Sequence, residues 1–274
     1  MAAHSVNVSH NGHATTEVYM NRDDSRWLRN YCPGPHLASQ LVCFPHAGGS
    51  ASFFLPMSRA LSDDLQVLAV QYPGRGDRRS EPCVHTIEAL ADAVADELAR
   101  CLDRSIALFG HSMGGLVAFE VARRLEARGR TPLALFVSGC RAPSRRRAQV
   151  VRLRDGEDVR AELERLGGTD PRLLDNSQAL RAALPAMRND YEAIDAYRLS
   201  SHAAPLSIPI HAYIGDSDPE VLPDEAVAWR RHTRGSFDLR TYPGGHFYLG
   251  SPEVDLASAI RTAMATSPAT GYRA

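Results

Sequence analysis

The stretch that decides the fold is LFGHSMGGLVAFEVARRL, residues 108–125, which joins an apolar run to an amphipathic helix. Residues 105–110 predict a buried strand, and residues 113–128 predict a helix. Between them stands Gly110-His111-Ser112-Met113-Gly114, a G-x-S-x-G pattern. Its glycines permit a sharp strand-to-helix turn that lifts the serine hydroxyl above the sheet. Ser112 could instead simply cap the helix, but the strand before it and the helix after it favour a nucleophile.

Strand-like and helical patterns alternate along the chain from residue 41 onward. Several apolar runs lack in/out alternation, which is typical of parallel strands that are covered on both faces. The alternation predicts an α/β fold with a doubly wound, mostly parallel sheet. Its predicted strands are residues 41–44, 65–72, 105–110, 133–138, 208–215 and 237–242, and its predicted helices are residues 86–102, 113–128, 224–232 and 253–265.

One region, residues 141–205, contains helical patterns and no good strand. It is too long for a plain connection, so we expect a helical lid over the strand ends, with an ordinary added subdomain as the alternative. Within it, Tyr191, Ile194 and Leu199 share a helical face that forms either the ceiling of a substrate chamber or the core of the lid. The predicted organisation is a core of residues 25–140 and 206–268, a lid of residues 141–205, a disordered polar N-terminal tail of residues 1–24 and a C-terminal tail of residues 269–274.

Composition excludes several classes of protein. The chain has 274 residues, 44% apolar and 23% charged, with a net charge of −1, as expected for a soluble globular protein without the basic footprint of a nucleic-acid binder. It has no apolar run of membrane-spanning length and no secretory signal, so we expect no membrane association. Five cysteines without a C-x-x-C pair suit a reducing, cytoplasmic location. The N-terminal histidines follow no metal-ligand spacing, and we expect no metal.

A serine nucleophile needs a base and an acid that orients it. His246 follows the predicted strand 237–242 directly, and Asp216 and Asp218 follow the strand before it. The order Ser…Asp…His is that of the α/β-hydrolases. We favour Asp218, because it stands at the far end of a turn that can reach the histidine loop, and expect Asp216 to bond the turn itself. His111 is disfavoured as the base, because its side chain should point away from the serine hydroxyl.

The tetrahedral intermediate of acyl transfer needs two N–H donors. Met113 supplies one amide at the start of a helix. The glycine-rich turn after the first predicted strand can supply the other, and we predict the amide of Ala47. His46, in the same turn, is interpreted as shaping the turn rather than acting as a base.

Four motifs together resemble the type II thioesterases, the free-standing editing hydrolases of polyketide and nonribosomal peptide assembly lines. They are FPHAGGSASFF (44–54), VQYPGRGDR (70–78), FGHSMGGLVAFEVA (109–122) and YPGGHFYL (242–249). The resemblance implies an α/β-hydrolase fold and hydrolysis of acyl thioesters on the phosphopantetheine arm of acyl or peptidyl carrier domains. It implies no cofactor beyond the arm that the substrate carries. It assigns the triad Ser112, Asp218 and His246 and the oxyanion amides of Ala47 and Met113.

Some alternatives stay open at the level of sequence. The same triad would serve a carboxylesterase acting on small free esters, and a relative of the fold could bind a ligand without turnover. Residues 72–79 either shape the rim of the site or form a glycine turn with solvated charges. Arg141 and Arg145–Arg147 either help a carrier protein to dock or form a solvated face. We expect a monomer and transient partners.

Overall fold

A computed structural model describes residues 25–33, 39–101, 104–145, 151–167, 169, 171–251 and 254–266. The predicted tails, residues 1–24 and 269–274, lie outside the described residues. The described chain forms one seven-stranded sheet with the order β1-β3-β2-β4-β5-β6-β7. The strands are β1 (Leu28–Arg29), β2 (Ser39–Phe44), β3 (Gln66–Val70), β4 (Ser105–His111), β5 (Leu135–Ser138), β6 (Ile210–Gly215) and β7 (Phe237–Tyr242).

The sheet confirms the prediction of a doubly wound, mostly parallel architecture. All six predicted strands are present, and they pair in parallel throughout. Strand β1, which the sequence did not predict, pairs antiparallel with β3 at the edge of the sheet. It is only two residues long, too short to leave an apolar pattern.

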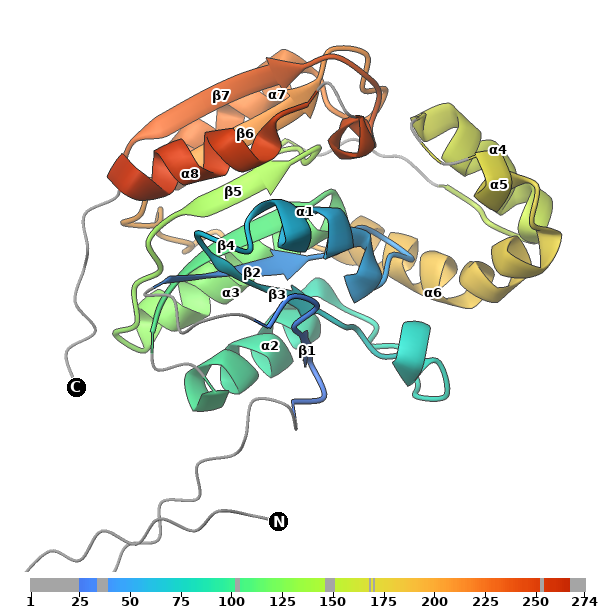
Figure 1. Ribbon diagram of the computed structural model, residues 1–274, viewed down its shortest axis with the longest axis horizontal. Helices are drawn as coiled ribbons and strands as arrows, with labels where there is room; N and C mark the ends of the chain where they lie inside the picture. Colours follow the sequence, from blue (N-terminus) through green and yellow to red (C-terminus); the bar gives the residue numbers. More distant parts are fainter. Residues whose placement is uncertain are drawn as a thin grey trace, which may run out of the picture.

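Helices cover both faces of the sheet, and this explains why the central strands are apolar on both sides (Figure 1). In β4, Ile106 and Leu108 pack on one face with α2 and α3, while Ala107 and Phe109 pack on the other with α8. The helices are η2 (Ala51–Phe54), α1 (Leu55–Ala60), η3 (Gly76–Arg78), α2 (Ile87–Cys101), α3 (Met113–Ala127), α7 (Pro223–Val227), η4 (Ala228–His232), η5 (Tyr248–Gly250) and α8 (Leu256–Thr266).

The interval predicted as a lid holds α4 (Gly156–Leu166), α5 (Pro171–Leu174) and α6 (Ser177–Ala196), and its described residues form no strand. These three helices stand together at one end of the sheet (Figure 1). They have their own apolar cluster, which includes Val159, Leu163 and Leu180 and also Phe247 from the loop after β7. The helical insertion therefore packs directly on the predicted histidine loop.

Two further features bear on the expectations from composition. Among the described residues, no helix combines the length and apolar character needed to cross a bilayer. None of the five cysteines, which all lie in the described part of the chain, forms a disulfide.

Candidate active site

Ser112 occupies the turn between β4 and α3 in a strained backbone conformation. Its φ is 55° and its ψ is −122°, and it is the only non-glycine residue with a positive φ in the described part of the chain. A side chain on Gly110 would strike the carbonyl of Gly114, and one on Gly114 would strike the carbonyl of Phe44. The Ser112 amide donates to the carbonyl of Ser138 at 2.8 Å, which ties the turn to β5. The sharp turn predicted from G-x-S-x-G is therefore present.

His246 and Asp218 form a buried pair beside this turn. The Nδ1–H group of His246 donates to both Asp218 oxygens, at 2.9 and 3.0 Å, because a carboxylate can only accept. The two side chains are 2% and 0% exposed. The amide of Glu220 donates to Asp218 at 2.8 Å and fixes the carboxylate. With Nδ1 protonated, Nε2 of His246 is free to accept a proton.

Asp216 does not join this pair. Its carboxylate accepts from the amide of Gly244 and from the hydroxyl of Ser217, each at 3.0 Å. Asp216 thus bonds its own turn, as predicted, and also ties that turn to the histidine loop.

The two predicted oxyanion donors border the same pocket as Ser112 and His246. Met113 is the first residue of α3, where the backbone N–H groups have no partner within the helix. The turn that carries Ala47 is closed by the Gly49 amide, which donates to the carbonyl of His46 at 2.9 Å. Both residues therefore line the pocket that Ser112 also lines, and the role of their amides as oxyanion donors stays a prediction.

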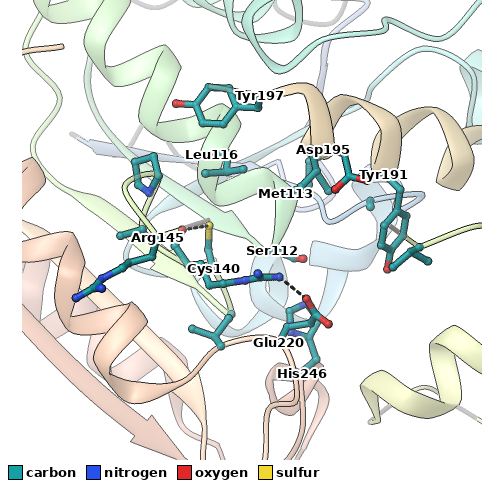
Figure 2. Close-up of a pocket in the computed structure, with 18 of the residues that line it drawn as sticks. Ser112, Met113, Leu116, Cys140, Arg145, Tyr191, Asp195, Tyr197, Glu220 and His246 are labelled. Carbon is teal, nitrogen blue, oxygen red and sulfur yellow. Dashed lines mark hydrogen bonds and ion pairs between the residues drawn. The ribbon is translucent and has the colours of Figure 1, made fainter. Parts of the chain in front are cut away.

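Ser112 and His246 share their pocket with Tyr191 of α6, and Figure 2 labels all three side chains. Leu116, Ile194 and Val151 give the pocket apolar walls, and Tyr191 lies on the lid side. Of the three residues predicted on one helical face, Tyr191 and Ile194 line the pocket. Ile194 and Leu199 also pack against the main core, and Tyr191 packs against the apolar cluster of the insertion. Cys140 also borders the pocket, and burial raises the pKa of its thiol to about 12, so it is not a competing nucleophile.

One side of the pocket carries a chain of charged groups that the sequence did not predict. Arg141 donates to Glu220 at 2.6 Å, and Arg165 of α4 bonds both Glu220 and Glu162. The Tyr191 hydroxyl donates to Glu162 at 2.7 Å. Burial alone would raise the pKa of Glu162, but hydrogen bonds from Arg165 and Tyr191 outweigh it and the pKa is lowered. This network links α4 and α6 to the loop that carries Asp218.

The arginines predicted at the rim differ in their burial and in their partners. Arg141 is paired within the pocket wall, so it is not a solvated charge. Arg145 also borders the pocket, and Arg146–Arg147 lie outside the described residues. In the loop 72–79, Arg75 and Arg78 are 6% and 7% exposed, so the interpretation of that loop as a turn with solvated charges is wrong for both.

Two further histidines, His46 and His111, lie near His246. The His46 ring packs edge-on against Phe53 and Phe247, and its Nδ1 atom is buried without a partner. Burial and the nearby charges of His246 and Arg75 lower the pKa of His46 to about 3, so it is a poor base at neutral pH. His111 does not line the pocket, and its Nδ1 atom lies 3.0 Å from the hydroxyl of Ser138.

His111 should make the stability of the fold depend on pH. It is fully buried, and burial, together with the charges of His246 and His46, holds its pKa well below 6.5. Below about pH 6.5 the unfolded chain therefore binds a proton that the folded chain does not. The free energy of unfolding should therefore fall as the pH is lowered below 6.5, by about 1.4 kcal/mol per pH unit from this group.

Urea unfolding of wild type and His111→Asn at pH 7 and pH 5 measures this dependence. Asparagine keeps a polar atom near Ser138 but does not titrate, so the variant should lose less stability between the two pH values than wild type does. His202→Asn, at an exposed position, is the control and should leave the difference unchanged. An unchanged pH dependence in His111→Asn would contradict the assignment.

The sheet order, the strained serine turn and the buried His–Asp pair place the chain among serine hydrolases of the α/β-hydrolase fold. The chain belongs to the Thioesterase domain family, whose sequence profile matches residues 39–264. It is 48% identical over 247 residues to "Thioesterase PikA5" of Streptomyces venezuelae. The matched residues cover 89% of this chain and 88% of that protein.

Solved structures agree with this assignment. The type II thioesterase BorB from the borrelidin biosynthetic cluster superimposes with a TM-score of 0.81 at 45% identity, covering 87% of this chain and 97% of that one. YbtT, a type II thioesterase from the yersiniabactin NRPS/PKS pathway, gives a TM-score of 0.73 at 32% identity, covering 85% and 95%. The chain is therefore a hydrolase acting on thioesters.

Proposed function

We propose that this protein removes acyl groups from the phosphopantetheine arm of acyl and peptidyl carrier proteins, clearing aberrant or stalled units from polyketide or nonribosomal peptide synthases. The observation that carries the proposal is the strained Ser112 turn beside the buried His246–Asp218 pair, in a chain 48% identical to PikA5. The proposed roles are nucleophile for Ser112, general base for His246 and orienting acid for Asp218.

The first half of the proposed reaction is acylation. Nε2 of His246 takes the proton as the hydroxyl oxygen of Ser112 attacks the thioester carbonyl. The amides of Ala47 and Met113 stabilise the negative charge that develops on the carbonyl oxygen. The C–S bond then breaks, and His246 returns the proton from Nε2 to the departing sulfur. The pantetheine arm leaves as a free thiol, and His246 is neutral again.

The second half is hydrolysis of the acyl-serine. His246 activates water against the ester carbonyl, the same two amides hold the second oxyanion, and the proton returns to Ser112. Asp218 keeps the proton on Nδ1 of His246 through both halves, which leaves Nε2 available to accept. The pantetheine arm belongs to the substrate, and the proposed mechanism uses no other cofactor.

The proposed partners are carrier proteins that dock transiently against a monomeric cytoplasmic enzyme. Arg145 at the pocket edge supports the docking, because a carrier bears a phosphate at the root of its arm. The apolar lining around Ile194 and Leu116 suits an acyl chain beneath the lid.

The test compares three substrates that bear the same acyl group: an acyl-carrier protein, the matching acyl-pantetheine thioester and the matching oxygen ester. Loss of the acyl group from the carrier is followed by intact-protein mass spectrometry. We expect kcat/KM to be highest for the acyl-carrier and at least about tenfold lower for the oxygen ester, because acylation breaks the bond to the leaving group. Turnover of the oxygen ester with an untouched acyl-carrier would make the protein a carboxylesterase of small esters instead.

A further inference from the structure

A buried ion pair joins the lid to the loop after β3. Asp190 lies on lid helix α6, and Arg75 lies in the loop 72–79. The guanidinium group meets both carboxylate oxygens, with Nη2 3.0 Å from Oδ1 and Nη1 bonded to Oδ2. The two side chains are 5% and 0% exposed. Such a two-point contact between buried charges fixes the relative position of the two segments.

The same carboxylate also binds the turn between β2 and η2, residues 45–50, which carries the Ala47 amide and is called the oxyanion loop below. Oδ2 of Asp190 accepts from the amide of Gly48 at 2.8 Å, and Gly48 follows Ala47 directly. Gly48 has a φ of 73°, and a side chain there would strike Met187 of the same lid helix. The turn that carries the Ala47 amide is therefore seated against α6 without room for a side chain.

Charge balance makes the arginine as important as the carboxylate. A buried carboxylate beside the oxyanion loop would repel the negative charge that develops on the substrate oxygen. Arg75 cancels that charge, while Asp190 raises the pKa of the guanidinium despite its burial, so Arg75 stays protonated. Arg75 is itself held by the carbonyl of Pro73, which accepts from Nε at 3.2 Å.

The lid also reaches the other side of the site. The amide of His246 donates to the carbonyl of Leu166, the last residue of α4, at 2.8 Å. One lid helix thus contacts the oxyanion loop and another contacts the histidine loop. The lid is attached to the two loops that flank Ser112, and the Arg75–Asp190 ion pair is its buried charged contact on the side of Ala47.

We propose that Arg75 and Asp190 are positioning residues for the oxyanion hole: Asp190 fixes the turn that presents the Ala47 amide, and Arg75 neutralises Asp190. The inference rests on the proposed acyl transfer at Ser112. It has an asymmetric consequence. Removing Arg75 leaves a negative charge beside the oxyanion, whereas removing Asp190 leaves a positive one. The Arg75 variant should therefore lose more catalysis than the Asp190 variant, and removing both should restore part of the loss.

The experiment uses Arg75→Met, Asp190→Asn and the double variant in the full chain. Two inhibitors report separate properties: a trifluoromethyl ketone forms an oxyanion with Ser112, and an analogue with a methylene in place of the carbonyl only fills the pocket. We expect Arg75→Met to weaken the ketone about 100-fold, a loss as large as that of one oxyanion donor, because the uncompensated Asp190 charge opposes the oxyanion. The methylene analogue, which forms no oxyanion, should change little. The double variant should recover about tenfold of that loss.

Arg78→Met is the matched control. It removes a buried guanidinium from the same loop, but that guanidinium pairs with Glu81 rather than with the lid. Its ketone affinity should stay close to that of wild type. If Arg75→Met does not fold, Arg75→Lys replaces it, since lysine keeps the charge but loses the two-point contact, and a smaller selective loss is expected.

Two results would overturn the inference: equal losses for both inhibitors in Arg75→Met, or a double variant no better than Arg75→Met. Both readouts need only a reactive Ser112, not a carrier substrate. Failure of the ketone comparison and failure of carrier deacylation are therefore distinguishable outcomes.

Discussion

Replacing Ser112 with alanine is expected to lower kcat for thioester hydrolysis by about 10⁵- to 10⁶-fold, the scale at which serine hydrolases lose their nucleophile. Without the hydroxyl oxygen no acyl-enzyme can form, and only the oxyanion amides and substrate binding remain. The fold should persist, because alanine at φ 55° meets the same strain as serine and leaves the Gly110 and Gly114 contacts intact. Single-turnover assays with intact-protein mass spectrometry measure both the rate and the acyl adduct.

Ser138→Ala is the matched control for Ser112→Ala. Ser138 is a second buried serine next to the turn, and its hydroxyl bonds His111 and Tyr248 rather than the pocket. Its carbonyl, which accepts from the Ser112 amide, is retained in alanine. The control should keep most of its activity and form the acyl adduct. An acyl adduct in Ser112→Ala would move the nucleophile to another residue.

The fold was predictable because its signals are local. Buried parallel strands are continuous apolar runs, and β4 and β6 fell where those runs stand. The missed strand β1 is two residues long and owes its conformation to pairing with β3, a contact between distant residues. Strand β5 begins at Leu135, two residues after its predicted start, because an apolar run does not show where ladder pairing begins.

The predicted site residues come together for the same reason. Ser112 and His246 each lie close to glycines in the sequence, and such glycines predict a sharp turn. The order of the strands brings both turns to one edge of the sheet. Asp218 could be chosen over Asp216 because position along a turn decides which carboxylate reaches the next loop.

The residues that the sequence did not reveal act through long-range pairing. Arg75 and Asp190 are separated by 115 positions, and no local sequence pattern around either residue predicts their contact. Arginine in a glycine-rich turn normally predicts a solvated charge. Arg75 is buried and paired only because α6 packs against the oxyanion loop and brings Asp190 to it. The Glu162–Arg165–Glu220 network is hidden in the same way, because its members come from the lid and from the loop after β6.

Asp218→Asn is expected to lower kcat about 10⁴-fold while leaving the fold intact. The asparagine amide would occupy the place of the carboxylate and donate to Nδ1 of His246, which stabilises the tautomer with the proton on Nε2. That tautomer cannot accept the proton of Ser112, so acylation and deacylation both slow. Steady-state kinetics on an acyl-pantetheine thioester measure the loss, and thermal unfolding checks that the variant is folded.

Asp216→Asn is the matched control, because it makes the same change two residues earlier in the same turn. Asp216 accepts from Gly244 and Ser217, and the asparagine carbonyl oxygen can accept from both. The control should therefore differ little from wild type in kcat. Comparable losses in the two variants would mean that the turn needs both carboxylates for its shape. A larger loss in Asp216→Asn would exchange the roles of the two acids. Only a selective loss in Asp218→Asn assigns the orientation of His246 to the carboxylate that contacts its Nδ1 atom at 2.9 Å.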